Sequence, residues 1–232
     1  MRKLGKKYVE ASKKVERNNL YSKEEAIKLV KETNTTKFDG SIDLAIRLNV
    51  DSSKNDQQLR GSIVLPAGTG KVQKILVIAD GEDAKKATAA GADFVGAEDM
   101  IEKIEKENWF GFDIIVATPK MMPKLGKLGK VLGPRGLMPN PKTNTVTTNT
   151  EKVVGDIKKG MIEYKTDSYG NVHSTLGKVS FKDKDLIENL TYFVKIINGL
   201  RPTSVKGEFI KSISISSTMG PGIKIDKNSF DI

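Results

Sequence analysis

The segment Gly68-Thr69-Gly70-Lys71 is the part of the chain most like a phosphate-binding loop. A P-loop requires a glycine five residues before its Gly-Lys pair and a serine or threonine directly after the lysine. Leu65 and Val72 occupy those positions, and Gln73 stands where a dinucleotide fingerprint needs its third glycine. We therefore interpret residues 68–71 as part of a flexible linker and expect no nucleotide site there.

Histidine and cysteine chemistry has few candidates. The chain contains one histidine, His173, and no cysteine, which excludes disulfides, thiol catalysis and cysteine-ligated zinc. His173 has no visible nucleophile for base catalysis and no companion ligands for a metal. We expect no enzyme activity, no metal site and no cofactor, and interpret His173 as a donor to RNA or a simple surface histidine.

Hydroxyl and glycine residues gather in Ser216-Ser217-Thr218-Met219-Gly220-Pro221-Gly222, after the last apolar alternation of the chain. Hydroxyl groups donate to phosphate or ribose oxygens, and glycines let a backbone approach closely. A plain turn at the end of a strand is the alternative. An exposed Met219 favours contact with a partner, since large apolar side chains in solvent often mark such contacts.

Lys37-Phe38-Asp39 places an aromatic ring beside a cation. RNA bases stack on aromatic rings while lysine contacts phosphate, so this segment is a second candidate contact. From spacing alone Phe38 fits a core position equally well, and both interpretations stay open at this point.

Residues 119–142 combine cations with proline. No acidic residue occurs between Asp113 and Glu151, and five of the eight prolines lie at positions 119, 123, 134, 139 and 141. The alternative is a solvated loop, but surface loops normally mix charge signs. We therefore favour a secondary basic loop that contacts phosphate through Lys120, Lys124, Lys127, Lys130, Arg135 and Lys142.

The net charge of +10 over 232 residues favours nucleic acid or an anionic membrane surface as the partner. No run approaches the ~18 apolar residues of a spanning helix, and the basic N-terminus lacks the apolar core of a secretory signal. The sequence thus predicts a cytoplasmic protein without a membrane partner, which we expect to be a monomer when free.

Both ends of the chain show an α+β pattern. We expect a basic helix over residues 1–17, a helix from a Ser22 capping box to about residue 32, and a strand over 42–48 paired with 60–65. Near the other end we expect strands at 161–165 and 172–181 around a turn at 169–171. A helix over 185–198 with Gly199 just beyond its end, and a strand ending at Ser217, complete the pattern.

The centre of the chain has a different pattern. Residues 75–79 and 114–117 are continuous apolar runs, typical of strands covered on both faces, and helices at 82–90 and 98–107 alternate with them and with a short strand at 94–95. We predict a discontinuous α+β RNA-binding domain with an antiparallel sheet (1–67 and 160–232) and an inserted Rossmann-like parallel α/β domain (68–159). The discontinuous domain carries 24 basic and 17 acidic residues, a net +7, so we expect the main RNA face there.

Several segments together carry a family resemblance. They are Gly5-Lys6-Lys7-Tyr8, Lys37-Phe38-Asp39, Asn55-Asp56-Gln57-Gln58-Leu59-Arg60-Gly61, Ala90-Gly91-Ala92-Asp93-Phe94-Val95-Gly96, Asp113-Ile114-Ile115-Val116-Ala117-Thr118-Pro119, residues 126–142 (GKLGKVLGPRGLMPNPK) and Thr218-Met219-Gly220-Pro221. With these segments the chain resembles, from end to end, the bacterial large-subunit ribosomal protein L-one family of the ribosomal stalk. The resemblance implies binding to stalk rRNA near the tRNA exit site, help in the release of deacylated tRNA, and repression of translation through the protein's own operon mRNA.

The resemblance also implies contact residues. Lys37, Phe38 and Ser41 match the first contact segment of the family, and Ser212, Thr218, Met219 and Gly220 match its last. Lys165, Asp167, His173 and Lys178 fall on the hairpin contacts, where Asp167 is expected to accept from a ribose 2′-hydroxyl. Tyr164 and Lys165 depart from the Phe and Arg common in relatives, and Ser41 from a common Thr; lysine lacks the bidentate fork of arginine. A nucleotide-dependent enzyme and a general RNA chaperone are the rival interpretations of the whole chain.

Overall fold

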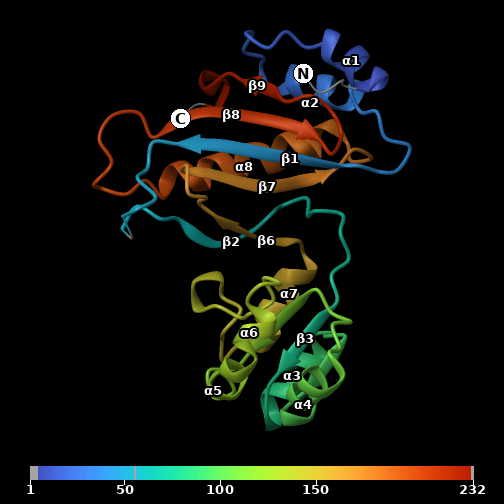
Figure 1. Cartoon of the computed structure of the whole chain (residues 1–232), viewed down its shortest axis with the longest axis vertical. Coiled ribbons are helices and arrows are strands. Elements are labelled where there is room, and N and C mark those ends of the chain that lie inside the picture. Colours follow the sequence, from blue (N-terminus) through green and yellow to red (C-terminus); the bar gives the residue numbers. More distant parts are fainter. Residues whose placement is uncertain (1–4, 55, 231–232) are drawn as a thin grey trace. The chain divides into compact units, whose positions relative to one another are not determined.

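Residues 5–54 and 56–230 are described by a computed structural model of the chain (Figure 1). Contacts divide it into two compact units: unit 1 runs to Gly70 and resumes at Ile162, and unit 2 runs from Lys71 to Met161. The first four residues of the predicted N-terminal helix and Asn55 of the family-like segments lie outside the described residues. That the units fold independently stays a prediction.

Unit 1 is built on a four-stranded antiparallel sheet in the order β7-β1-β8-β9. Its strands are β1 (Ser41–Leu48), β7 (Asn171–Lys178), β8 (Ile210–Ser217) and β9 (Ile223–Ile225). Helices α2 (Lys23–Glu32) and α8 (Asp183–Gly199) lie against one face of it, as Figure 1 shows. Alternate residues of β1, Ile42, Leu44 and Ile46, are buried toward those helices. The remaining elements of this unit are α1 (Lys6–Lys13), the 3-10 helix η3 (Lys227–Phe230) and the strand pair β2 (Arg60–Val64) and β6 (Met161–Lys165).

Two local predictions for unit 1 hold in detail. The Ser22 side chain accepts from the Glu25 backbone N–H while the Glu25 side chain accepts from that of Ser22, which is the predicted capping box. The alternation over 42–48 forms a strand with one buried face. Both features are set by residues within a few positions of one another.

The predicted strand partners in unit 1 are wrong. The segment 60–65 does not pair with β1, because β7 and β8 occupy both edges of β1; β2 pairs with β6 instead. Because β7 pairs with β1, the predicted hairpin of 161–165 with 172–181 forms only at its turn, through an isolated bridge between Thr166 and Val172. The buried Tyr164 ring lies against Gly61, where an added Cβ would be 2.5 Å from its hydroxyl, so the glycine makes room for this pairing.

Two segment boundaries also differ from the prediction. Gly199 is the last residue of α8 rather than a residue beyond it. The supposed flexible linker at 66–70 is a turn held by Asn189, whose side chain accepts from the Ala67 N–H and donates to the Gly68 carbonyl. Side-chain hydrogen bonds from a residue more than 100 positions away leave no local sequence signal.

Unit 2 contains a three-stranded parallel sheet in the order β4-β3-β5, as the alternation of strands and helices predicts. Its strands are β3 (Ile75–Ile78), β4 (Phe94–Gly96) and β5 (Ile114–Ala117), and its longer helices are α3 (Gly81–Ala89), α4 (Glu98–Glu107) and α7 (Thr150–Lys158). Helix α7 and, in unit 1, strand β9 were not predicted from the sequence. Among the described residues no helix is long and apolar enough to cross a membrane.

The proline-rich segment of unit 2 is not the loop that we predicted. It forms α5 (Met122–Leu125), η1 (Gly126–Leu128), α6 (Gly129–Leu132) and, after a turn, η2 (Pro141–Thr143). Met121, Leu125, Leu128 and Leu132 are buried at helical spacing and fix these turns against the core of the unit.

Candidate nucleic-acid interface

The two candidate contact segments meet at one end of the four-stranded sheet. The Ser41 N–H donates to the Thr218 hydroxyl at 2.9 Å, and the Thr218 N–H donates to the Ser41 carbonyl at 3.0 Å. Lys178 of the neighbouring strand donates to the Ser41 hydroxyl at 3.3 Å. Residues separated by 177 positions thus form one cluster, which we call the end cluster: Lys37, Phe38, Ser41, Lys178, Thr218, Met219 and Gly220.

Phe38 and Met219 both extend into solvent, with 60% and 61% of their surface exposed. The interpretation of Phe38 as a core residue, which its spacing allowed, is therefore wrong. The backbone beneath it is held: the Thr36 hydroxyl donates to the Phe38 carbonyl, and the Asp39 carboxylate accepts from the N–H and hydroxyl of Ser180. Exposed apolar side chains on a fixed backbone are a feature of binding surfaces.

The hydroxyl of Thr218 is engaged within the protein. It accepts from the Ser41 N–H and reaches the Ser41 carbonyl at 3.2 Å. It therefore joins the two contact segments, and we infer that it positions them. Its contact with RNA stays a prediction.

The fold itself requires a glycine at position 220. Its N–H donates to the Ser217 carbonyl, and a Cβ at this position would lie 2.2 Å from the Ser217 hydroxyl oxygen. The tight turn that presents Thr218 and Met219 depends on this absence of a side chain.

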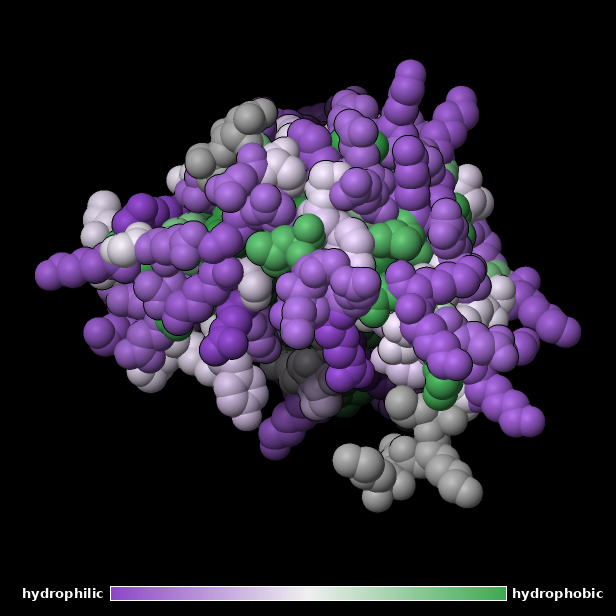
Figure 2. All heavy atoms as spheres, turned by 90° about the horizontal axis from the view of Figure 1, so that it is seen from above, coloured by the Kyte–Doolittle hydropathy of each residue, from purple (hydrophilic) through white to green (hydrophobic). Residues whose placement is uncertain are grey.

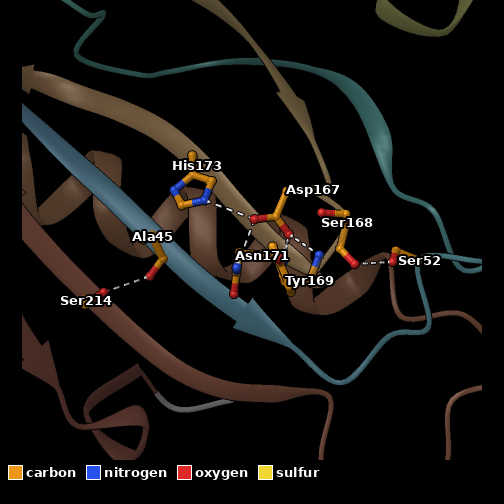
Figure 3. A network of polar contacts seen from close by, with 8 residues as sticks. All are labelled: Ala45, Ser52, Asp167, Ser168, Tyr169, Asn171, His173 and Ser214. Carbon is orange, nitrogen blue, oxygen red and sulfur yellow. Dashed lines mark hydrogen bonds and ion pairs between the residues drawn. The ribbon is translucent and has the colours of Figure 1, made fainter.

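A second cluster lies at the other end of β7, in the turn shown in Figure 3. One Asp167 carboxylate oxygen accepts from the N–H groups of Tyr169 and Asn171 at 2.8 and 2.7 Å. The other accepts from the Asn171 side chain at 2.9 Å and lies 3.5 Å from Nε2 of His173. The His173 side chain is 63% exposed. Because four groups contact the carboxylate, we infer that Asp167 orients the turn and His173. Its contact with a ribose hydroxyl stays a prediction.

The titration of Asp167 gives a test of this positioning role. Partial burial alone would raise its pKa, but hydrogen bonds from Asn171, Tyr169 and His173 lower the pKa from 3.8 to about 2. A lowered folded-state pKa contributes stability above pH 3.8, which is lost as the pH falls through about 2. Asp167→Asn should therefore lower the free energy of unfolding at neutral pH, with a deficit that shrinks toward pH 2. Urea titrations across this range measure the deficit, and a deficit independent of pH would contradict the assignment.

The remaining predicted contacts of unit 1 are spread over the surface. Ser212 is exposed on β8, across from Arg47 of β1, and so shares the sheet surface that carries His173. Lys165 is exposed at the end of β6, outside the four-stranded sheet and one residue before the bridge at Thr166.

The basic segment of unit 2 is partly neutralised within its own unit. Lys124 forms an ion pair with Glu98, and the Arg135 guanidinium lies 3.6 Å from the centre of the Phe110 ring. Lys120, Lys127, Lys130 and Lys142 are exposed. The absence of acidic residues along the segment therefore did not mean the absence of acidic neighbours in space. Stacking on a ring does not neutralise Arg135, so it remains, with Lys120, Lys127, Lys130 and Lys142, exposed and without an ion pair to a described residue.

The structure offers no phosphate loop at Gly68-Thr69-Gly70-Lys71. Thr69 is buried, and the first turn of α3, the helix after the first strand of the parallel sheet, carries Glu82 and Asp83, which repel phosphate. Within residues 5–54 and 56–230 no group of three or more His, Cys, Asp or Glu is arranged to hold a metal ion.

Sequence reasoning missed several polar residues on the solvent face of the sheet. Their signal was present, because they are the polar partners in the same alternation that identified β1 and β8. They are Asp43, Arg47, Thr175, Ser214 and Lys224.

Comparison with known families matches residues 30–221 to the model described as the Ribosomal protein L1p/L10e family. The match includes Lys37, Phe38, the hairpin turn, the basic segment of unit 2 and the turn through Gly220, and it spans most of the 232 residues. The end cluster and the turn around Asp167 are thus features of a ribosomal RNA-binding protein, and the chain belongs to the Ribosomal protein L1p/L10e family.

Proposed function

We propose that this protein binds the rRNA of the mobile stalk of the large ribosomal subunit, near the tRNA exit site, through unit 1. The observation that carries the proposal is the end cluster, where Phe38 and Met219 are exposed on backbone segments joined by Ser41 and Thr218. Aromatic and thioether side chains supply stacking surface for bases, while Lys37 and Lys178 supply charge for phosphates.

The recognition is mainly of RNA shape. The end cluster offers apolar side chains, backbone groups and hydroxyls on a rigid support, and such a surface fits a folded RNA better than a linear sequence of bases. The exposed lysines of unit 2, Lys120, Lys127, Lys130 and Lys142, add a contact that is independent of sequence and sensitive to salt.

The same surface accounts for two further proposed roles. An mRNA that folds into the shape of the stalk RNA would compete for it, so the protein represses translation of its own operon when free in excess. When the protein is bound to the stalk, its remaining cations contact the deacylated tRNA that leaves the exit site and assist its release.

The test is a filter-binding titration of the full chain with a stalk rRNA fragment and with an unrelated RNA of equal length. We expect Phe38→Ala and Met219→Ala each to lower stalk RNA affinity by roughly tenfold, since loss of one stacked contact costs about 1–3 kcal/mol. Neither change should destabilise the fold, because both side chains are exposed. Tyr192→Ala is the matched control, since Tyr192 is an exposed aromatic on α8, which covers the opposite face of the sheet.

Three outcomes would contradict the proposal. Equal binding of both RNAs at physiological salt would indicate a general RNA chaperone. Unchanged affinity of both variants would remove the end cluster from the interface, and an equal loss in Tyr192→Ala would mean that the effect is not local.

A further inference from the structure

The solvent face of the four-stranded sheet connects the end cluster with the turn around Asp167. Helices α2 and α8 cover the other face. The strand register aligns the outward residues in rows that run across the sheet, which are Thr175–Asp43–Ser216, His173–Ala45–Ser214–Lys224 and Asn171–Arg47–Ser212. We call these ten residues the open face.

The side chains in the middle of the open face are small. Ala45 is on the central strand with Ser214 beside it, and the Ser214 hydroxyl lies 3.4 Å from the Ala45 carbonyl (Figure 3). Ser212 and Ser216 continue a line of small hydroxyl side chains along β8. None of the ten positions holds Phe, Tyr or Trp, so the face offers hydroxyls and close backbone approach instead of stacking.

Polar side chains lie at both ends of this line of small side chains. Thr175 donates to the Asp43 carboxylate at 2.8 Å at the end near Ser41. Arg47 lies at the other end, between Asn171 and Ser212, and its exposed side chain forms no hydrogen bond or ion pair with any other described residue. Ser41 and Arg47 are six residues apart on one strand, which corresponds to roughly 20 Å. That length spans about three nucleotides of an RNA backbone.

The open face differs from an apolar docking surface, because nine of its ten residues are polar or charged and the tenth is Ala45. The side of the molecule seen from above in Figure 2 is also covered mainly by hydrophilic side chains, with small separate hydrophobic patches. A partner bound through small hydroxyls and an unpaired guanidinium is a polar, anionic one. The sugar–phosphate backbone of RNA has that chemistry, with ribose hydroxyls that pair with serine and phosphates that take the guanidinium bidentately.

We propose that the open face is the floor of the RNA site, with Ala45 and the serines of β8 as a track for the sugar–phosphate backbone and Arg47 as a phosphate anchor at its far end. The inference rests on the proposed function and adds residues to it. An RNA strand bound at the end cluster would then cross Ala45 and reach Ser212 and His173. This path accounts for predicted contacts at both ends of the same strands.

The test uses the full chain, the stalk rRNA fragment and two pairs of variants. Ala45→Trp places a large side chain where the RNA backbone would pass, and Glu24→Trp on the exposed side of α2 is its control. Arg47→Gln removes one charge from the open face, with Lys28→Gln removing the same charge from α2. We expect losses of roughly tenfold for Ala45→Trp and fivefold for Arg47→Gln, with the salt slope of Arg47→Gln smaller by about 1. Both controls should remain within about twofold of the unchanged protein.

The outcomes separate this inference from the proposed function. If the unchanged protein fails to prefer stalk RNA, the proposed function itself fails. If it prefers stalk RNA while Ala45→Trp folds and binds normally, the track is wrong and the end cluster stands alone. Equal losses in Arg47→Gln and Lys28→Gln would mean a general charge effect and overturn the anchor. Should Ala45→Trp fail to fold, Ser214→Glu tests the same track by repulsion of phosphate, and normal binding by that variant would overturn it.

Discussion

Gly220→Ala is expected to lower affinity for stalk RNA by roughly tenfold or more, equivalent to about 1.4 kcal/mol. The added Cβ would lie 2.2 Å from the hydroxyl oxygen of Ser217, a residue that is only 2% exposed and has little room to rearrange. The turn must then open, which displaces Met219 and the Thr218 link to Ser41. Filter binding measures the loss, and circular dichroism checks that the fold persists.

Two further variants make this expectation specific. Gly222→Ala adds the same methyl group two residues away, where no atom lies within 4 Å, and should bind normally. Ser217→Ala removes the atom in conflict, and this hydroxyl is buried without a hydrogen-bond partner, so its removal should cost little. The double variant Ser217→Ala, Gly220→Ala should therefore recover most of the affinity. If it binds no better than Gly220→Ala, the steric explanation is wrong.

Asn189→Leu is expected to have the largest effect on stability, a loss of roughly 2–4 kcal/mol in the free energy of unfolding of unit 1. Asn189 is fully buried, accepts from the Ala67 N–H at 3.0 Å, and donates to the carbonyls of Gly68 and Leu176 at 2.9 and 2.8 Å. Leucine has a similar volume but leaves these backbone groups without partners. Asn198→Leu, a half-buried position in the same helix, is the control and should change little.

The same measurement tests the proposed independence of the two units. The single tryptophan, Trp109, is in unit 2, so its fluorescence reports that unit alone. In urea, Asn189→Leu should shift the circular dichroism transition to lower concentration while the fluorescence transition stays in place. A parallel shift of both would show that the units unfold together, and an unchanged circular dichroism transition would remove the structural role of Asn189.

Short-range sequence patterns are enough to predict the local elements and the class of partner. The Ser22 capping box, the alternation of β1 and the continuous apolar runs of β3 and β5 depend on spacings of two to four residues, where local chemistry and burial agree. The excess of cations and the family-like motifs pointed to RNA before any contact was known, and the family match supports that coarse function.

Strand pairing and the contacts of most site residues depend instead on the packing of segments that are far apart in the chain. The alternation in β1 required one buried face but did not distinguish 60–65 from β7 and β8 as partners, because pairing depends on the packing of distant segments. The same limit applied to side chains. Phe38 is exposed and Thr218 bonds to Ser41, 177 positions away, so both roles depend on where folding places distant segments. Asp167 differs, because its carboxylate accepts from N–H groups only two and four residues ahead in its own turn.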